Sequence, residues 1–384
     1  MQMPRRLFAA VLVSLVSGLS GCAGYIAGQL VDAPRDRGLI EMPVNEHGQT
    51  PMDLLAEREL ALSMDDGIEL RASVIDPAQR EFLNTWFAPG DEPGDAGKGL
   101  LRLTLRYIED GVVLGSSVTQ FRPAPADGSP IHGTAVLLHG FSMDRLQMVS
   151  WAVYLASHGW RTVLVDLRGH GESGGDERAW GPGDGRDLQA LANALYEREL
   201  VVGPLVAFGA SYGGAAALHW ASVDRRLDAV VTLAAYANAG EVIQTGADVV
   251  VPFGRMIPDR TLARGIERAG ERIGNDLMNG ISPESVANDI LAPVMIIHGA
   301  DDRVVPVAHA QRLHDAMDGS TLWIHDDLRH LDITIRQDLV GQQILDWLDQ
   351  TIRITPDITS TACPAMRTRL PSRVHHRSPP RLDT

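Results

Sequence analysis

Hydrophobic and polar positions divide the chain into two kinds of pattern. Between residues 57 and 130, short apolar runs are separated by turns that end in Asp-Gly, which is typical of β-hairpins. The runs and their turns are, in order, 60–64, Asp65-Asp66-Gly67, 68–74, 101–107, Glu109-Asp110-Gly111 and 112–121. We predict that these runs are antiparallel strands that open a sheet. The alternative is that the first hairpin belongs to a small N-terminal appendage.

From residue 134 onward, buried apolar runs alternate with helical patterns. The predicted strands are 134–138, 161–165, 205–208, 229–234, 294–298 and 321–324. The predicted helices are 146–158, 188–199, 214–221 and 339–352. Strands that alternate with helices indicate an α/β fold, with a mostly parallel, doubly wound sheet that helices cover on both faces.

Three segments depart from this rhythm. Residues 236–291 form an insert with a predicted helix at 261–278, and an insert at this place lies above the strand ends, where it can act as a small helical lid. Residues 23–56 are mixed in composition and punctuated by proline, so we predict a tether. Residues 354–384 are rich in Pro, Ser, Thr and Arg, which predicts a disordered tail.

Charge and cysteine content exclude several classes of function. The 384 residues carry a formal charge of −15, and because both ends are basic the body at 23–353 carries −20. Such a body repels nucleic acid and anionic lipid head groups, so we expect neither as a ligand. The two cysteines, Cys22 and Cys363, lack the spacing of metal ligands and do not suggest cysteine catalysis.

The first 22 residues have the pattern of an export signal. Arg5-Arg6 precede an apolar stretch, 7–19, that is too short to span a bilayer as a helix. The stretch ends in Leu19-Ser20-Gly21-Cys22, which resembles the lipobox of bacterial lipoproteins. The resemblance implies cleavage before Cys22 and acylation of its thiol, which would anchor the protein in a membrane. The residue after the cysteine, Ala23, is not an acidic retention signal. Its identity therefore favours the periplasmic side of the outer membrane as the destination. The alternatives are an ordinary cleaved signal and an uncleaved anchor.

One glycine-flanked serine stands between a predicted strand and a predicted helix. The stretch is Gly209-Ala210-Ser211-Tyr212-Gly213. Strand, G-x-S-x-G and helix is the layout of a nucleophile elbow, in which the tight turn requires small flanking residues. A second match, 171–175, contains Ser173 but leads into a Gly/Pro-rich stretch that predicts a loop. We therefore predict Ser211, not Ser173, as the nucleophile.

Four motifs together resemble those of the α/β-hydrolase superfamily over residues 100–352. In chain order they are Leu138-His139-Gly140-Phe141, the run 166–173 (DLRGHGES), the elbow at 209–213, and the run 298–306 (HGADDRVVP). The resemblance implies an α/β-hydrolase domain, which we place at 57–353. It also implies that an acid and a histidine follow the nucleophile in that order.

The resemblance assigns roles to individual residues. It implies Asp302 as the acid that orients the base, and His330 as the base that activates Ser211. Asp301 is the alternative acid, although turn formation is its simpler role. His325 is the alternative base, and two further histidines are expected at the surface of a helix, His309 and His314.

The oxyanion hole requires backbone N–H donors. The resemblance implies that Tyr212 supplies one and Phe141 the other, while His139 shapes the turn. The expected role of Asp166, Arg168 and His170 is a structural network of hydrogen bonds and ion pairs.

The sequence thus predicts a membrane-anchored serine hydrolase that cleaves carboxylic esters through an acyl-enzyme. We expect a small acyl substrate, no metal, no organic cofactor and no nucleic acid. A serine peptidase, a thioesterase or an acyltransferase would use the same residues, and a non-catalytic lipoprotein that binds a partner is the alternative from another class.

Overall fold

A computed structural model of the chain describes residues 22–33, 51–78, 82–87, 101–109, 112–121, 128–245, 256–278 and 280–352, together with Asp91. All of these residues belong to one compact unit of the chain. The predicted signal at 1–22, apart from Cys22, and the predicted tail from 354 lie outside the described residues, as does Cys363. Within the described part, no helix combines the length and the apolar character that crossing a membrane requires.

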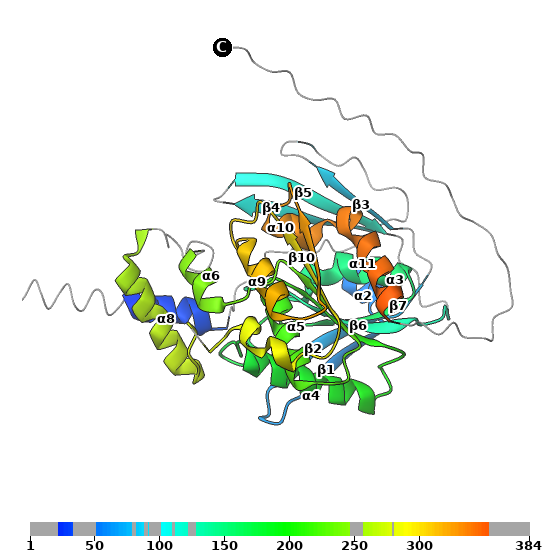
Figure 1. The fold of residues 1–384 in the computed structure, drawn as a ribbon. Helices are drawn as coiled ribbons and strands as arrows, with labels where there is room; N and C mark the ends of the chain where they lie inside the picture. Colours follow the sequence, from blue (N-terminus) through cyan, green and yellow to red (C-terminus); the bar gives the residue numbers. More distant parts are fainter. Residues whose placement is uncertain are drawn as a thin grey trace, which may run out of the picture. The chain divides into compact units, whose positions relative to one another are not determined.

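An eight-stranded sheet forms the centre of the unit (Figure 1). Its strand order is β1-β2-β7-β6-β8-β9-β10-β11, and all neighbours from β7 to β11 are parallel. The strand bounds are β1 Arg58–Ser63, β2 Glu69–Ile75, β6 Gly133–Leu138, β7 Trp160–Val165, β8 Leu205–Ala210, β9 Ala229–Leu233, β10 Val294–Gly299 and β11 Thr321–His325. The predicted α/β fold is confirmed, with an antiparallel pair at one edge.

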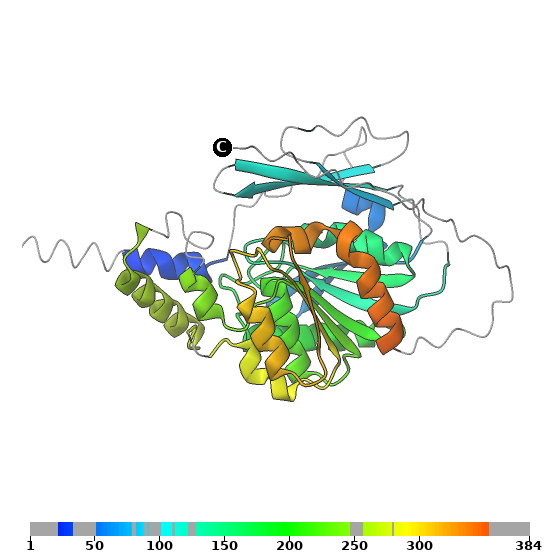
Figure 2. The ribbon, with the colours of Figure 1, turned by 45° about the horizontal axis from the view of Figure 1, so that its top comes forward.

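Helices cover both faces of this sheet (Figures 1 and 2). Three helices pack on one face: α4 (Pro182–Glu197), α5 (Tyr212–Val223) and α9 (Ala308–Ala316). Two pack on the other face: α3 (Val149–Ser157) and α11 (Gln337–Thr351). Strands β6 to β10 are buried at every position because both faces are covered, which explains their unbroken apolar runs.

The two predicted hairpins do not share one sheet. The first, β1–β2, joins the central sheet because β2 pairs with β7, so it is not an appendage. The second forms a separate antiparallel sheet of order β3-β5-β4, from β3 (Phe82–Phe87), β4 (Leu101–Glu109) and β5 (Val112–Phe121). The prediction that all these strands open one sheet is therefore wrong for the second hairpin, since β2 already occupies the pairing edge of β7.

The insert contains α6 (Ala239–Thr245), α8 (Asp259–Ile273) and the 3₁₀ helix η3 (Pro283–Asp289). The predicted helix at 261–278 is shifted toward the C-terminus relative to α8, which begins at Asp259 and ends at Ile273. Helix α8 ends at Ile273 because Gly274 adopts a left-handed conformation, with φ 65°, which is a common helix stop.

The predicted tether at 23–56 is contradicted at both of its described ends. Residues 22–31 form a helix, here named the N-terminal helix, whose Ile26 and Leu30 are fully buried. It lies beside α8, and Figure 1 shows the two helices next to each other. The short helix α2 (Pro51–Leu55) also buries Met52 and Leu55. The apolar residues 23, 26, 27 and 30 are three or four positions apart, so they form one stripe along the helix. The prediction of a tether rested on the mixed composition and the prolines and overlooked this spacing.

Candidate active site

Ser211 occupies the turn between strand β8 and helix α5. Its backbone has φ 52° and ψ −113°, a strained conformation for a residue with a side chain. The turn is tight because a Cβ on Gly209 would collide with the Gly213 carbonyl, and a Cβ on Gly213 would collide with the Leu138 carbonyl. The chain therefore needs glycine at both flanking positions, and this geometry matches a nucleophile elbow.

The structure brings Ser211, His330 and Asp302 into one hydrogen-bonded chain. The Ser211 hydroxyl lies 3.0 Å from His330 Nε2, and His330 Nδ1 donates to Asp302 Oδ2 at 2.7 Å. Asp302 follows strand β10, and His330 is the first residue of α10 (His330–Ile335). Both side chains are buried. The three residues thus have the contacts that a nucleophile, a base and an orienting acid require.

Asp302 is held as a carboxylate by several donors. Its Oδ1 accepts from the backbone N–H of Val304 at 2.9 Å and of Val305 at 2.7 Å. Nε2 of His298 donates to the Val305 carbonyl at 2.8 Å and lies 3.2 Å from Asp302 Oδ2. Burial alone would raise the pKa of Asp302, but His330 and His298 outweigh it and hold that pKa well below the usual range.

The alternative residues have other surroundings. Asp301, next to Asp302, is exposed. His325 stacks on Trp323, with ring centroids 5.2 Å apart, at the end of β11. Ser173 has its hydroxyl engaged within its own loop, where it donates to the Asp166 carbonyl at 2.6 Å. The expectation of a surface position is wrong for His309, which is 4 % exposed and accepts a bond from the Ala237 N–H.

The two backbone N–H groups expected for an oxyanion hole are those of Phe141 and Tyr212. Within the described residues, neither the Phe141 N–H nor the Tyr212 N–H donates a hydrogen bond. The turn that carries Phe141 is held by His139, whose Nδ1 donates to the Gly140 carbonyl at 2.9 Å and whose Nε2 accepts from the Leu167 N–H at 3.1 Å. His139 thus shapes the turn, and unpaired donors of this kind suit an oxyanion.

A buried carboxyl group behind the elbow has no counterpart in the sequence analysis. The Tyr212 hydroxyl donates to Asp184 Oδ2 at 2.8 Å and accepts from the Trp180 N–H at 3.3 Å. Asp184 Oδ1 has no partner among the described residues, and burial raises the pKa of Asp184 to about 7. An aspartate in the first turn of a helix suggests an ordinary dipole contact, so the sequence holds no signal for this role.

The loop after β7 is held by charge pairs. The carboxylate of Asp166 accepts from Arg145, and Arg168 makes a two-pronged contact with Asp187, with both distances 2.7 Å. Arg168 also pairs with Asp66 at 2.7 Å. These contacts agree with the structural network that we expected for this loop.

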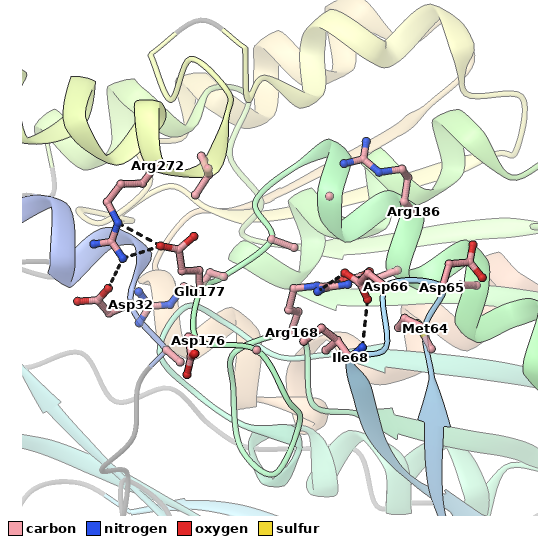
Figure 3. Close-up of a pocket in the computed structure, with 18 residues that line it drawn as sticks. Asp32, Met64, Asp65, Asp66, Ile68, Arg168, Asp176, Glu177, Arg186 and Arg272 are labelled. Carbon is pink, nitrogen blue, oxygen red and sulfur yellow. Dashed lines mark hydrogen bonds and ion pairs between the residues drawn. The ribbon is translucent and has the colours of Figure 1, made fainter.

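A surface groove of about 1100 Å³ lies along this loop (Figure 3). Charged side chains of both signs line it, including Asp66, Arg168, Arg186 and Arg272. None of Ser211, Asp302 and His330 is among its lining residues. The groove is therefore a feature separate from the three hydrogen-bonded residues.

Comparison with known proteins agrees with the fold. Residues 129–269 match the family model described as serine aminopeptidase, S33. The chain has the α/β-hydrolase fold. This match to a family of serine hydrolases covers the elbow but less than half of the chain.

Solved structures of similar fold include an esterase and another hydrolase, and one curated protein is similar in sequence. The Pyrococcus furiosus esterase Pf2001 is similar in fold, with a TM-score of 0.52 and 18% identity over 83% of this chain and 100% of that chain. A 2,6-dihydroxy-pseudo-oxynicotine hydrolase gives a TM-score of 0.51 and 16% identity over 77% of this chain and 68% of that one. The uncharacterised protein YqkD of Bacillus subtilis (strain 168) is 26% identical over 224 residues, which are 56% of this chain and 70% of YqkD.

Proposed function

We propose that this protein is a membrane-anchored serine esterase in which Ser211, His330 and Asp302 form the catalytic triad. The observation that carries the proposal is the unbroken chain of hydrogen bonds from Asp302 through His330 to Ser211, combined with the strained backbone of Ser211. Ester hydrolysis is the commonest activity in this superfamily, and an esterase is among the proteins of similar fold.

The proposed reaction follows from the roles of these groups. His330 Nε2 accepts the Ser211 proton as Oγ attacks the acyl carbonyl, and the carboxylate of Asp302 stabilises the imidazolium that forms. The N–H groups of Phe141 and Tyr212 donate to the oxyanion. His330 then protonates the leaving alcohol, and water activated by His330 hydrolyses the acyl-enzyme.

A fluorophosphonate probe tests the nucleophile. We expect wild-type protein to be labelled at one residue, and Ser211→Ala to be unlabelled while it remains folded by circular dichroism. Equal labelling of both proteins, or labelling of neither, would contradict the catalytic proposal and would favour a non-catalytic binding protein.

The substrate class requires a second experiment. We expect p-nitrophenyl esters to be hydrolysed with a kcat/KM at least about 100-fold above that for aminoacyl-anilides if the protein is an esterase. The description of the family model favours a peptidase as the second candidate, and faster turnover of the anilides would select it.

Membrane attachment through Cys22 is a further part of the proposal. The thiol is exposed at the first residue of the N-terminal helix, which is compatible with acylation there. Several acyl chains on one residue give stable anchoring. Mass spectrometry of the mature protein tests this part, since an unmodified N-terminus at another residue would contradict it. The periplasmic side of the outer membrane is the location we propose, and cell fractionation checks it.

A further inference from the structure

One face of the N-terminal helix is packed into the unit. Ile26 and Leu30 are fully buried in the same core cluster as Leu262 and Ile266 of α8. The two helices approach so closely at Gly265 that a Cβ there would collide with Ile26. This helix is therefore held in one position against the insert.

Three consecutive carbonyl groups at the end of this helix are capped by one segment of the loop after β7. Gln29 O accepts from Arg178 Nη1 at 2.9 Å, Leu30 O from Trp180 Nε1 at 3.0 Å, and Val31 O from the Arg178 N–H at 2.9 Å. The last carbonyls of a helix lack partners within the helix and carry a partial negative charge, so a cation is favoured there. The helix end thus fixes both Arg178 and Trp180.

The same two side chains contact the candidate oxyanion hole. The Arg178 guanidinium, 3 % exposed, lies 4.3 Å from the centre of the Phe141 ring, and its Nη2 donates to Ser142 Oγ at 3.3 Å. The Trp180 ring centre is 5.5 Å from that of Phe141 and 5.1 Å from that of Tyr212. Cation–π and edge-to-face contacts of this kind orient rings in a dry environment.

The turn that carries Phe141 needs such support. Ser142 has φ 63°, which is uncommon for a residue with a side chain, and it follows Phe141 directly. A strained turn persists only when its surroundings hold it. Displacing an oxyanion donor by a fraction of an ångström weakens its interaction with the transition state.

We propose that Arg178 is a positioning residue that holds the Phe141–Ser142 turn in the geometry of an oxyanion hole, and that the N-terminal helix is the element that fixes Arg178. The inference rests on the proposed function above. It assigns the segment that begins at Cys22 to the active-site scaffold. Catalysis then depends on a helix far from Ser211 in the sequence.

Substitution of Arg178 tests the positioning role. In the full-length protein, Arg178→Met retains a long apolar side chain but removes the guanidinium. We expect kcat on a p-nitrophenyl ester to fall about 30-fold with KM changed less than about threefold, since the turn acts on the transition state. The rate of fluorophosphonate labelling should fall in parallel, and Arg178→Lys should recover part of both.

Arg272 offers a matched control at the same junction. It pairs with Asp32 at 2.5 Å and with Glu177 at 2.6 Å, as Figure 3 shows, but it does not contact Phe141 or Ser142. Arg272→Met should leave kcat within about twofold of wild type because exposed ion pairs contribute little. Equal effects of the Arg178 and Arg272 substitutions would overturn the proposal.

A second pair of variants tests the helix itself, and keeps the proposal testable if Arg178→Met does not fold. Gly265→Ala introduces a collision with Ile26, whereas Gly24→Ala places its Cβ 3.8 Å from the flexible Arg268 side chain. We expect the first to lower kcat several-fold at unchanged KM and the second to leave it unchanged.

The outcomes separate this inference from the proposed function. If wild-type protein is neither labelled nor active, both fall together. If it is labelled and active but Arg178→Met and Gly265→Ala both retain wild-type kcat, only the positioning role of Arg178 and the N-terminal helix is contradicted.

Discussion

Two buried carboxyl groups near the nucleophile turn have pKa values shifted in opposite directions. Asp302 contacts His330, and Asp184 contacts the Tyr212 hydroxyl, with exposed fractions of 5 % and 1 %. The pKa of Asp302 is lowered, while the pKa of Asp184 is raised to about 7. Burial is therefore not what distinguishes the two groups.

The difference lies in the donors that each group receives. Asp302 accepts from two backbone N–H groups and from His330, with His298 also within 3.2 Å. Asp184 accepts one bond from a neutral hydroxyl, and its second oxygen has no partner in the described part of the chain. A carboxylate surrounded by donors remains charged, whereas a poorly solvated one favours its neutral form. The two buried acids therefore differ in the pH range over which each is charged.

Removing the charged acid should have the largest effect. Asp302→Asn leaves the shape of the site unchanged but removes the acceptor that selects the His330 tautomer with a free Nε2. We expect kcat to fall about 10⁴-fold with a small change in KM. Steady-state kinetics on a p-nitrophenyl ester measures this loss, with Ser211→Ala as the reference for complete inactivation. A loss of less than about tenfold would show that Asp302 is not the orienting acid.

Neutralising the other acid should change stability in a pH-dependent way. The folded state of wild type binds the Asp184 proton more tightly than the unfolded state, whose pKa is near the ordinary value of about 3.9. The contribution of this group to stability is therefore complete below about pH 4 and is lost as pH rises to about 7. Asp184→Asn removes that dependence.

Urea unfolding of both proteins at pH 5 and pH 8 measures the effect. We expect the free energy of unfolding of wild type, relative to Asp184→Asn, to decrease by about 3 kcal/mol between these two values. A difference that does not vary with pH would mean that Asp184 is ionised throughout.

The sequence predicted the role of Asp302 but gave no indication of the role of Asp184. Asp302 could be placed because its strand is a continuous apolar run and the motif after it has a fixed order relative to Ser211. Asp184 depends on a contact between two helices, α4 and α5, whose facing positions local patterns do not specify. The predicted strands were accurate for the same reason, because a strand that is buried on both faces requires a continuous apolar run in the sequence.

The N-terminal segment shows the limit of composition as a guide. Prolines at 34, 43 and 51 suggested a tether, yet the stripe at 23, 26, 27 and 30 is buried against α8. The helix is stabilised by tertiary contacts with a segment more than 200 residues away, and a short helix draws most of its stability from such packing. A hydrophobic-moment reading of 22–31 would have detected the stripe, but not its partner.

His298 sharpens the comparison, because its Nε2 lies 3.2 Å from Asp302 Oδ2 and its role was not assigned from the sequence. We expect His298→Leu to lower kcat about tenfold, because it removes both the bond to the Val305 carbonyl and a polar group that helps to lower the pKa of Asp302. His298→Gln is the matched variant, since its amide can donate from nearly the same place as Nε2. Kinetics of the two variants should differ by at least about threefold, and equal losses would assign His298 to packing alone.

Asp301 gives the smallest expected effect and the strictest test of the donor argument. It is adjacent to Asp302 and carries the same group, but its side chain is exposed to water and makes no ion pair among the described residues. Water and salt screen a charge in that position, so its influence on His330 should be slight. We expect Asp301→Asn to retain kcat within about twofold at 150 mM salt and to show the same pH–rate profile as wild type. A loss comparable to that of Asp302→Asn would mean that proximity to the turn, and not the arrangement of donors around a buried oxygen, decides which aspartate serves His330.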